Sequence, residues 1–289
     1  MHFNFDFSAA QVLWTLTFAA LLVLLVVLLG RDRAQRFPWF TASIALMGVL
    51  LLTTQVLLSK MSRFTGTEVF LILSNLEVVV SLLVLVELAR RSFRGVSRLG
   101  WIIGTLVIVG VGAAVLVFWG QWPAWKTLTA ASELATIRLM DLAVDKGILF
   151  SSIATVELGL LITLLGRRFG AGWHSHAQRI AIGLSTAALA QLTLRESLQA
   201  IGTRTHIHTQ ADYDRVMDLR DKLIHGNNAV YLCVLAWWIA CMWFDEPGAA
   251  SAAEAETETA EGEAVGSEGL EAVEESEPHP RSAGTDAHN

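Results

Sequence analysis

Seven long apolar runs dominate this sequence and limit it to membrane-spanning folds. They cover residues 8–29, 38–59, 68–89, 99–119, 145–166, 179–201 and 227–244. A helix needs about 20 apolar residues to cross a hydrocarbon layer about 30 Å thick. Backbone amides find no water inside lipid, so each run must form a helix. The sequence therefore predicts an all-α fold, a seven-helix transmembrane bundle within residues 1–244.

Arginines fall in alternate links between the runs, which predicts an orientation. The links after runs one, three and five hold Arg31, Arg33, Arg36, Arg90, Arg91, Arg94, Arg98, Arg167, Arg168 and Arg179, with one acid, Asp32. The other links mix basic and acidic residues, and residues 1–7 contain no lysine or arginine. Because basic loops stay on the cytoplasmic side, we expect the N-terminus outside and the C-terminus inside.

Residues 245–289 differ in composition from the rest of the chain. They hold 13 of the 27 acidic residues and one basic residue, Arg281. Almost no large apolar side chain is present, so this segment cannot bury enough surface to offset the entropy lost on ordering. We expect a disordered acidic cytoplasmic tail, which either only solubilises the chain or docks a basic partner.

Two outer links have the apolar spacing of amphipathic helices. We expect residues 121–144 to lie at the membrane interface or to extend run five outward. In residues 202–226, Asp212 is predicted to cap a helix and Gly226 to end it. The two short helices would pack together as an outer cap, which either captures a ligand or only covers the mouth of the bundle.

The second of these links also contains candidate metal ligands. His206 and His208 are followed by Asp212, Asp214 and His225. Imidazoles and carboxylates bind zinc and other divalent ions. These residues predict a metal site formed by His206, His208 and His225. The alternative is that the histidines only face solvent, because an HxH pair shares one face only in an extended segment.

Polar side chains within the runs mark a candidate site. A charge at the bilayer centre costs about 2.5–3.5 kcal/mol on insertion scales, so each one needs a partner. Two sets of polar residues each follow one face of a helix, and one further acid stands alone. They are Ser74, Glu77 and Ser81 in run three, Gln191, Arg195 and Gln199 in run six, and Glu157 in run five. We expect Arg195 to pair with Glu77 or Glu157. The cluster is either a ligand site, proton path or switch, or a structural network of ion pairs and hydrogen bonds.

Small residues in run four predict a site of close helix packing. Gly110 and Ala114 lie four residues apart, and therefore on one helix face. Two small residues at this spacing let a neighbouring helix approach closely.

Several sequence signatures of enzymes and cofactor proteins are absent. The chain has no HExxH, GxSxG or Walker-type GxxxxGK[ST] motif. All eight histidines lie outside the apolar runs, so the sequence does not support a haem held by two histidines inside the bundle. We therefore expect a protein that is not an enzyme, has no cofactor and does not bind nucleic acid.

Residues 145–192 (DKGILFSSIATVELGLLITLLGRRFGAGWHSHAQRIAIGLSTAALAQL) and the later CMWFDEP carry a resemblance to a known family. With the motif RRFG-x-x-W followed by IAIGL, runs five to seven resemble an uncharacterised family of bacterial seven-helix integral membrane proteins. The resemblance implies the same fold and a bacterial inner membrane, and no activity. The overall plan also looks like the seven-helix input modules that precede histidine kinases.

Two functions fit these features. The leading hypothesis is a non-enzymatic sensing or scaffolding module in the lipid bilayer, which acts through a partner protein. The 45 residues of the tail 245–289 cannot form an output domain with such a composition, so a signal would have to pass to a separate protein. The tail would contact this partner. The alternative is a small-solute or proton-coupled transporter that uses Glu77, Glu157 and Arg195.

Overall fold

The computed structural model describes residues 9–57, 60, 62–93, 97–119, 122, 133–165, 175–204 and 209–244. Every regular element among these residues is a helix, which confirms the all-α prediction for them. The helices are α1 (Ala9–Gly30), α2 (Arg33–Arg36), α3 (Pro38–Leu52) with a π-helical turn η1 (Thr53–Leu57), α4 (Arg63–Ser92), α5 (Arg98–Phe118), α7 (Glu133–Leu165), α8 (His176–Arg204) and α9 (Gln210–Trp243). The chain divides between Phe244 and Asp245. The acidic segment 245–289 lies outside the described residues, so its disorder stays a prediction.

Six helical segments are long and apolar enough to cross a membrane. They are Ala9–Gly30, Pro38–Gln55, Phe64–Ser92, Gly100–Phe118, Ala135–Leu164 and Gln210–Trp243. This finding indicates a multi-pass membrane protein. The predicted run 179–201 does form a helix, α8, but α8 is not among the six. The reason lies in its composition, because Arg179, Arg195 and Glu196 interrupt its apolar residues.

The two outer links do not form separate short helices where the structure describes them. Residues 133–144 extend run five outward as the first turns of α7, which was one of the two alternatives. The helix expected to end at Gly226 instead continues to Trp243 as α9. A glycine inside a helix costs only about 1 kcal/mol relative to alanine, whereas a break near lipid would leave several backbone groups without partners. The prediction of two short packed outer helices is therefore wrong for the described residues.

Local side chains explain where several helices begin. The Ser62 hydroxyl accepts a hydrogen bond from the Thr65 amide at the start of α4, and Ser97 accepts one from Gly100 at the start of α5. At the start of α9, Thr209 is the N-cap and exchanges reciprocal hydrogen bonds with Asp212. Each pattern satisfies amides that have no partner within the first turn. Asp212 thus supports the cap, as the third residue of the helix rather than as the N-cap itself.

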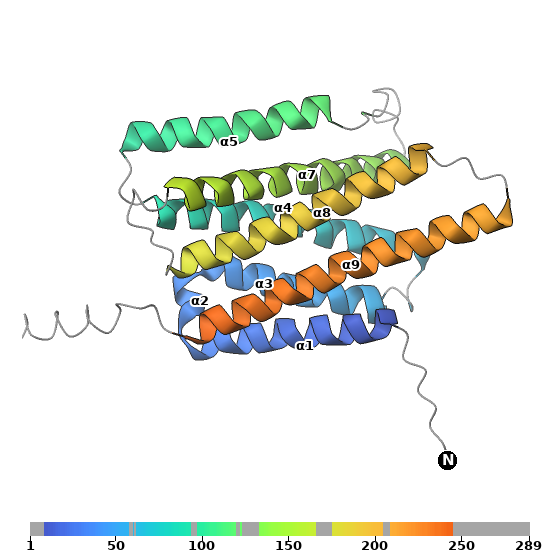
Figure 1. Cartoon of the computed structure of the whole chain (residues 1–289), viewed down its shortest axis with the longest axis horizontal. Helices are drawn as coiled ribbons and strands as arrows, with labels where there is room; N and C mark the ends of the chain where they lie inside the picture. The colour runs from blue at the N-terminus through green and yellow to red at the C-terminus, as the bar shows by residue number, and fades with distance from the viewer. Residues whose placement is uncertain are drawn as a thin grey trace, which may run out of the picture. The chain divides into compact units, whose positions relative to one another are not determined.

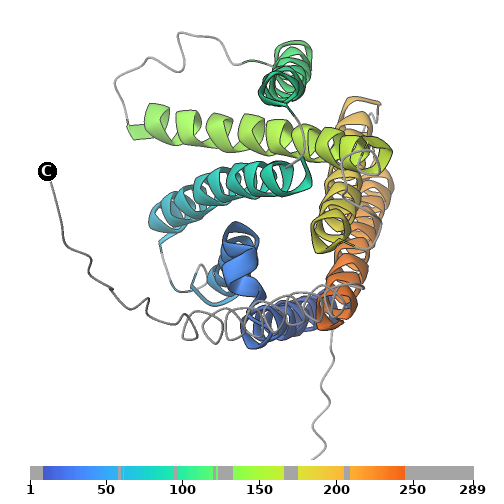
Figure 2. The ribbon, with the colours of Figure 1, turned by 90° about the vertical axis from the view of Figure 1, so that its left-hand side faces the viewer.

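The helices follow one common direction in the view of Figure 1, whereas Figure 2 shows that α4 and α7 are inclined to α5. Helix α7 packs against α4, α5 and α8, and α9 packs against α1 and α8. Helix α3 lies against α1 and α4, whereas α5 lies at the edge beside α7 (Figure 2). One end of this bundle carries Arg31, Arg33, Arg36, Arg90, Arg91, Arg98 and Arg179, and we refer to it as the arginine end.

The packed apolar core lies toward the arginine end. It is formed by the last turns of α1, α4, α7 and α9 and by the first turns of α3 and α8. Leu24, Leu28, Ile162, Ile180 and Leu235 are fully buried there. Toward the opposite end, α3, α4, α7, α8 and α9 leave a cavity between them.

Polar contacts also hold the arginine end together. The Arg33 side chain, 7% exposed, contacts Nε2 of His176 and donates a hydrogen bond to the Phe244 carbonyl at 3.2 Å. On α4, Glu87 accepts a hydrogen bond from the Phe40 amide at 3.1 Å, at the start of α3. These contacts link α2 to α8 and the end of α9, and link α3 to α4. They fix this end of the bundle.

Candidate functional site

A polar cavity of about 280 Å³ lies between α3, α4, α7, α8 and α9. Its polar wall consists of Ser43, Glu77, Ser81, Ser151, Ser152, Thr155, Gln191, Asn227, Asn228 and Tyr231. Its apolar lining includes Phe40, Ile44, Met47, Val84, Leu85, Leu184 and Trp238. A wall of mostly apolar residues with several convergent polar groups is typical of small-molecule sites.

Helical periodicity explains why these polar groups meet. On α4, Glu77 and Ser81 are four residues apart, so they lie on the same face. On α9, Asn227 and Tyr231 have the same spacing. These faces point inward, so the bundle gathers polar side chains that would be costly to expose to lipid.

Two aromatic residues close the cavity toward the arginine end. The rings of Phe40 and Trp238 meet edge to face, with their centroids 5.1 Å apart, and each residue is 1% exposed. The Trp238 indole lies directly against α8 because residue 183 is glycine. A Cβ atom there would fall 2.3 Å from Nε1 of Trp238. Both rings belong to the packed core as well as to the cavity lining, so the cavity directly adjoins the core.

Among the residues that the structure describes, Glu77 is the only carboxylic acid in this cavity wall, and none of the lining residues there is basic. Among the described residues, its carboxylate has no salt bridge and no hydrogen bond, because the ion pairs and hydrogen bonds found there involve other side chains. Gln191, Asn227 and Asn228 also have side chains without a hydrogen bond to another described residue. These four side chains are therefore available to a bound molecule or to water.

The structure brings together only some of the residues predicted for the polar cluster. Glu77, Ser81 and Gln191 line the cavity. The remaining members do not belong to its wall: Ser74 is buried beside it on α4, Gln199 is exposed on α8, and Glu157 and Arg195 lie elsewhere. One oxygen of Glu157, Oε2, is buried without a hydrogen-bond partner in the part of the chain that the structure describes.

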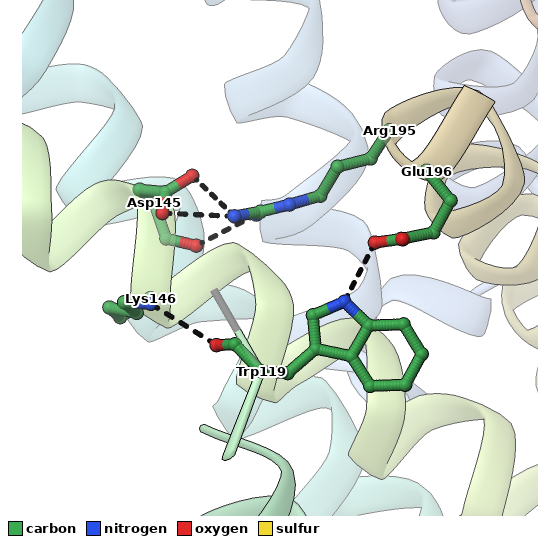
Figure 3. Close-up of polar contacts among 5 residues, drawn as sticks. All are labelled: Trp119, Asp145, Lys146, Arg195 and Glu196. Carbon is green, nitrogen blue, oxygen red and sulfur yellow. Dashed lines mark hydrogen bonds and ion pairs between the residues drawn. The ribbon is translucent and has the colours of Figure 1, made fainter. Parts of the chain in front are cut away.

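Arg195 pairs with Asp145, so the prediction that it pairs with Glu77 or Glu157 is wrong. Its guanidinium lies 2.9 Å from one Asp145 carboxylate oxygen and 3.0 Å from the other, and it also reaches the Asp145 carbonyl (Figure 3). Asp145 precedes the apolar part of α7, and Arg195 lies in the half of α8 that is farther from the arginine end. An acid at the same depth was therefore a closer partner than the carboxylates near the middle of the bundle.

Further contacts around this pair connect α5, α7 and α8. The Trp119 indole donates a hydrogen bond to Glu196 at 2.8 Å, and Lys146 donates one to the Trp119 carbonyl at 3.4 Å (Figure 3). The Lys146 ammonium also lies 4.9 Å from the centre of the Trp122 ring. Each of these four charged side chains thus has a partner within the chain, and the contacts join the end of α5 to α7 and α8.

The predicted metal site is largely outside the described residues. His206 and His208 fall in the segment 205–208, which the structure does not describe, and His225 lies within α9. Within the described ranges, no group of three histidine, cysteine, aspartate or glutamate side chains is arranged to hold a metal ion. Metal binding by His206, His208 and His225 stays a prediction.

Sequence reasoning missed most of the hydroxyl and amide groups of the cavity wall. These are Ser43, Ser151, Ser152, Thr155, Asn227, Asn228 and Tyr231. Serine and threonine in apolar helices often bond only to their own backbone, as Thr155 does with the Ser151 carbonyl. A hydroxyl in an apolar run is therefore a poor indicator of a site. The pair Asn227–Asn228 was a stronger signal, because asparagine is costly in lipid.

No protein family, no curated protein and no solved structure matches this chain. The resemblance of runs five to seven to a family of bacterial seven-helix proteins therefore stays a prediction.

Proposed function

We propose that this chain is a seven-helix protein of a bacterial inner membrane that binds a small polar solute in the cavity and signals its presence to a partner protein. In this proposal it is a non-enzymatic sensing module. The observation that carries the proposal is the cavity, because five helices each contribute polar groups to one partly apolar site.

The position of α8 supports counting it as a seventh membrane crossing. It has 29 residues, which corresponds to a length of about 44 Å, and it packs lengthwise between α7 and α9 (Figure 1). Gln191 faces the cavity and Arg195 is paired with Asp145. Two of the polar side chains that lower the hydropathy of α8 thus have a place within the bundle, one at the cavity and one in an ion pair with α7.

The distribution of charge supports an orientation with the arginine end in the cytoplasm. Seven described arginines gather at that end, whereas the opposite ends of α7, α8 and α9 carry both acids and bases. Under the positive-inside rule this places the N-terminus outside and the acidic tail, residues 245–289, inside. The tail would then be available to a cytoplasmic partner.

Sensing fits the geometry better than the alternative transporter. A transporter using Glu77, Glu157 and Arg195 would need these groups along one path, but only Glu77 borders the cavity. Beyond Phe40 and Trp238 the arginine end is filled by the packed core. A solute bound in the cavity would therefore change the packing of five helices rather than follow an open route across the bundle.

Binding can be tested with the purified full chain in detergent. A panel of small polar solutes should contain members that raise its melting temperature, because a ligand that binds only the folded state stabilises it. Ser81→Phe, which fills the cavity, should remove this stabilisation. Ala114→Phe, on the exposed side of α5, should keep it. A solute that is instead accumulated by liposomes containing the protein would favour transport, and stabilisation that survives in Ser81→Phe would contradict the cavity as the site.

A further inference from the structure

We infer that the cavity takes a small organic cation, a protonated amine with a short hydrocarbon part, and that Glu77 is its counter-ion. This inference depends on the proposed function and specifies the chemical class of its ligand.

The charge of the wall provides the first argument. Glu77 is the one ionisable acid there, and no lysine, arginine or histidine lines the cavity among the described residues. A carboxylate inside a membrane protein requires a neutralising partner, since an unpaired buried charge is expensive. The described part of the chain supplies none for Glu77. An anionic solute would meet repulsion, and a neutral one would leave the carboxylate without a partner.

A comparison within the same bundle strengthens this argument. Arg195 is matched by Asp145, and Arg91 lies 3.7 Å from the buried acid Glu87. The fold therefore places a cation beside two of its acids, although Glu157, like Glu77, has no ion pair among the described residues. At Glu77 it instead leaves a cavity of about 280 Å³. We interpret this difference as a position reserved for a cation from outside the chain.

The apolar lining selects an organic cation over a metal ion. A bare ion would occupy a small part of about 280 Å³ and would leave the rest to water. Phe40 and Trp238 present aromatic surface at one end of the cavity. Such surface binds hydrocarbon and also attracts cations to the face of a ring. The volume is near the lower limit of about 300 Å³ for ligand pockets, which restricts the solute to a small molecule.

The remaining polar groups can orient the amine. An ammonium group offers up to three N–H donors. Glu77 can accept one, and the side-chain carbonyls of Gln191 and Asn227 can accept others, because these side chains have no partner among the described residues. Charge-assisted hydrogen bonds of this kind are about twice as strong as neutral ones. The site should therefore discriminate an amine from the alcohol of equal size.

Calorimetric titration of the full chain with matched probes tests this inference. The probes are 2-phenylethylammonium, 2-phenylethanol and 3-phenylpropionate, at constant ionic strength. We expect the ammonium to bind about tenfold more tightly than the alcohol, as one good charge-assisted hydrogen bond implies, and the carboxylate to bind most weakly. Glu77→Gln should remove the preference for the ammonium and leave the affinity for the alcohol unchanged.

Glu157→Gln is the matched control, because it neutralises another acid of a spanning helix outside the cavity wall. It should keep the preference for the ammonium. If Glu77→Gln does not fold, Glu77→Asp serves instead. Aspartate keeps the charge on a side chain that is one methylene shorter. It should weaken the binding of the ammonium probe and leave the binding of the alcohol and the carboxylate probes unchanged.

The outcomes separate this inference from the proposed function. Equal binding of ammonium and alcohol, or a preference that persists in Glu77→Gln, would overturn the inference while a solute site remained. Stabilisation by sodium or potassium chloride alone, lost in Glu77→Gln, would assign the cavity to an inorganic cation and would also overturn it. Failure of every solute to bind the unmodified chain would overturn the proposed function itself.

Discussion

Replacing Gly183 by alanine tests the contact that positions the aromatic end of the cavity. The new Cβ atom would lie 2.3 Å from Nε1, 2.7 Å from Cε2 and 3.0 Å from Cζ2 of Trp238. Carbon atoms in optimal contact are about 3.5–4.0 Å apart, so the indole has to move by roughly 1 Å. Trp238 is 1% exposed, packs against Phe40 and lines the cavity, so the displaced indole either disturbs this ring contact or enters the cavity.

The expected effect combines two opposing terms. Overpacking a filled core costs about 1–3 kcal/mol, and the size of the overlap places this position in the upper half of that range. Alanine is favoured over glycine within a helix by about 1 kcal/mol. Gly183→Ala should therefore lower the free energy of unfolding by about 1–2 kcal/mol. Gly110→Ala is the control, since nothing lies within 4 Å of its Cβ position, and it should leave stability unchanged or raise it by up to about 1 kcal/mol.

Equilibrium unfolding in mixed micelles, with increasing sodium dodecyl sulfate, measures both changes. Adding Trp238→Phe to Gly183→Ala should recover part of the loss, because the smaller ring leaves room for the methyl group. The double-mutant cycle should then give a coupling of roughly 1 kcal/mol. Equal effects of the two glycine substitutions, together with zero coupling, would refute the close packing of Trp238 on α8.

Three further predictions concern other parts of the chain. Because their side chains are 27% and 48% exposed, Arg195 and Asp145 should contribute less than about 1 kcal/mol as a pair; a coupling of 3 kcal/mol or more in a double-alanine cycle would contradict the exposed position of the pair. A reporter fused after Arg94 should be cytoplasmic and one inserted near Ala211 external, and reversed compartments would overturn the orientation. A cytoplasmic partner recovered with the full chain should be lost when residues 245–289 are deleted, while solute binding persists; a partner retained after deletion would assign the interface to the helices.

The helices themselves were predictable because apolar run length and the hydrogen-bonding demand of the backbone leave few alternatives in lipid. Their ends were less predictable. Gly226 looked like a terminator, yet α9 continues past it, because the packing of the following turns outweighs the weak local preference of one glycine. Helix α8 is not among the helices apolar enough to cross a membrane, because its sequence contains polar residues. Sequence alone did not show that one of them, Gln191, lines the cavity.

The site was partly predictable for a similar reason. The depth of Glu77 in its run indicated a functional carboxylate, but sequence spacing does not show which helices are neighbours. It therefore could not identify Asp145 as the partner of Arg195. Glycine was ambiguous in the same way: Gly110 was expected at a close helix contact and has open space around it, whereas Gly159 and Gly183 lie against Ser185 and Trp238.

The construction of the cavity has a consequence for how the protein is made. Its wall includes Asn227, Asn228, Tyr231 and Trp238 of α9, the last helix to leave the ribosome among those described. A chain that stops after α8 has four helices around an incomplete site whose carboxylate, on α4, already lies in the membrane. Under the proposed function, a solute therefore binds only after the final helix has inserted. Such a solute would act on the newly made protein as a folding ligand, and it would protect finished molecules from quality-control proteolysis without protecting unfinished ones.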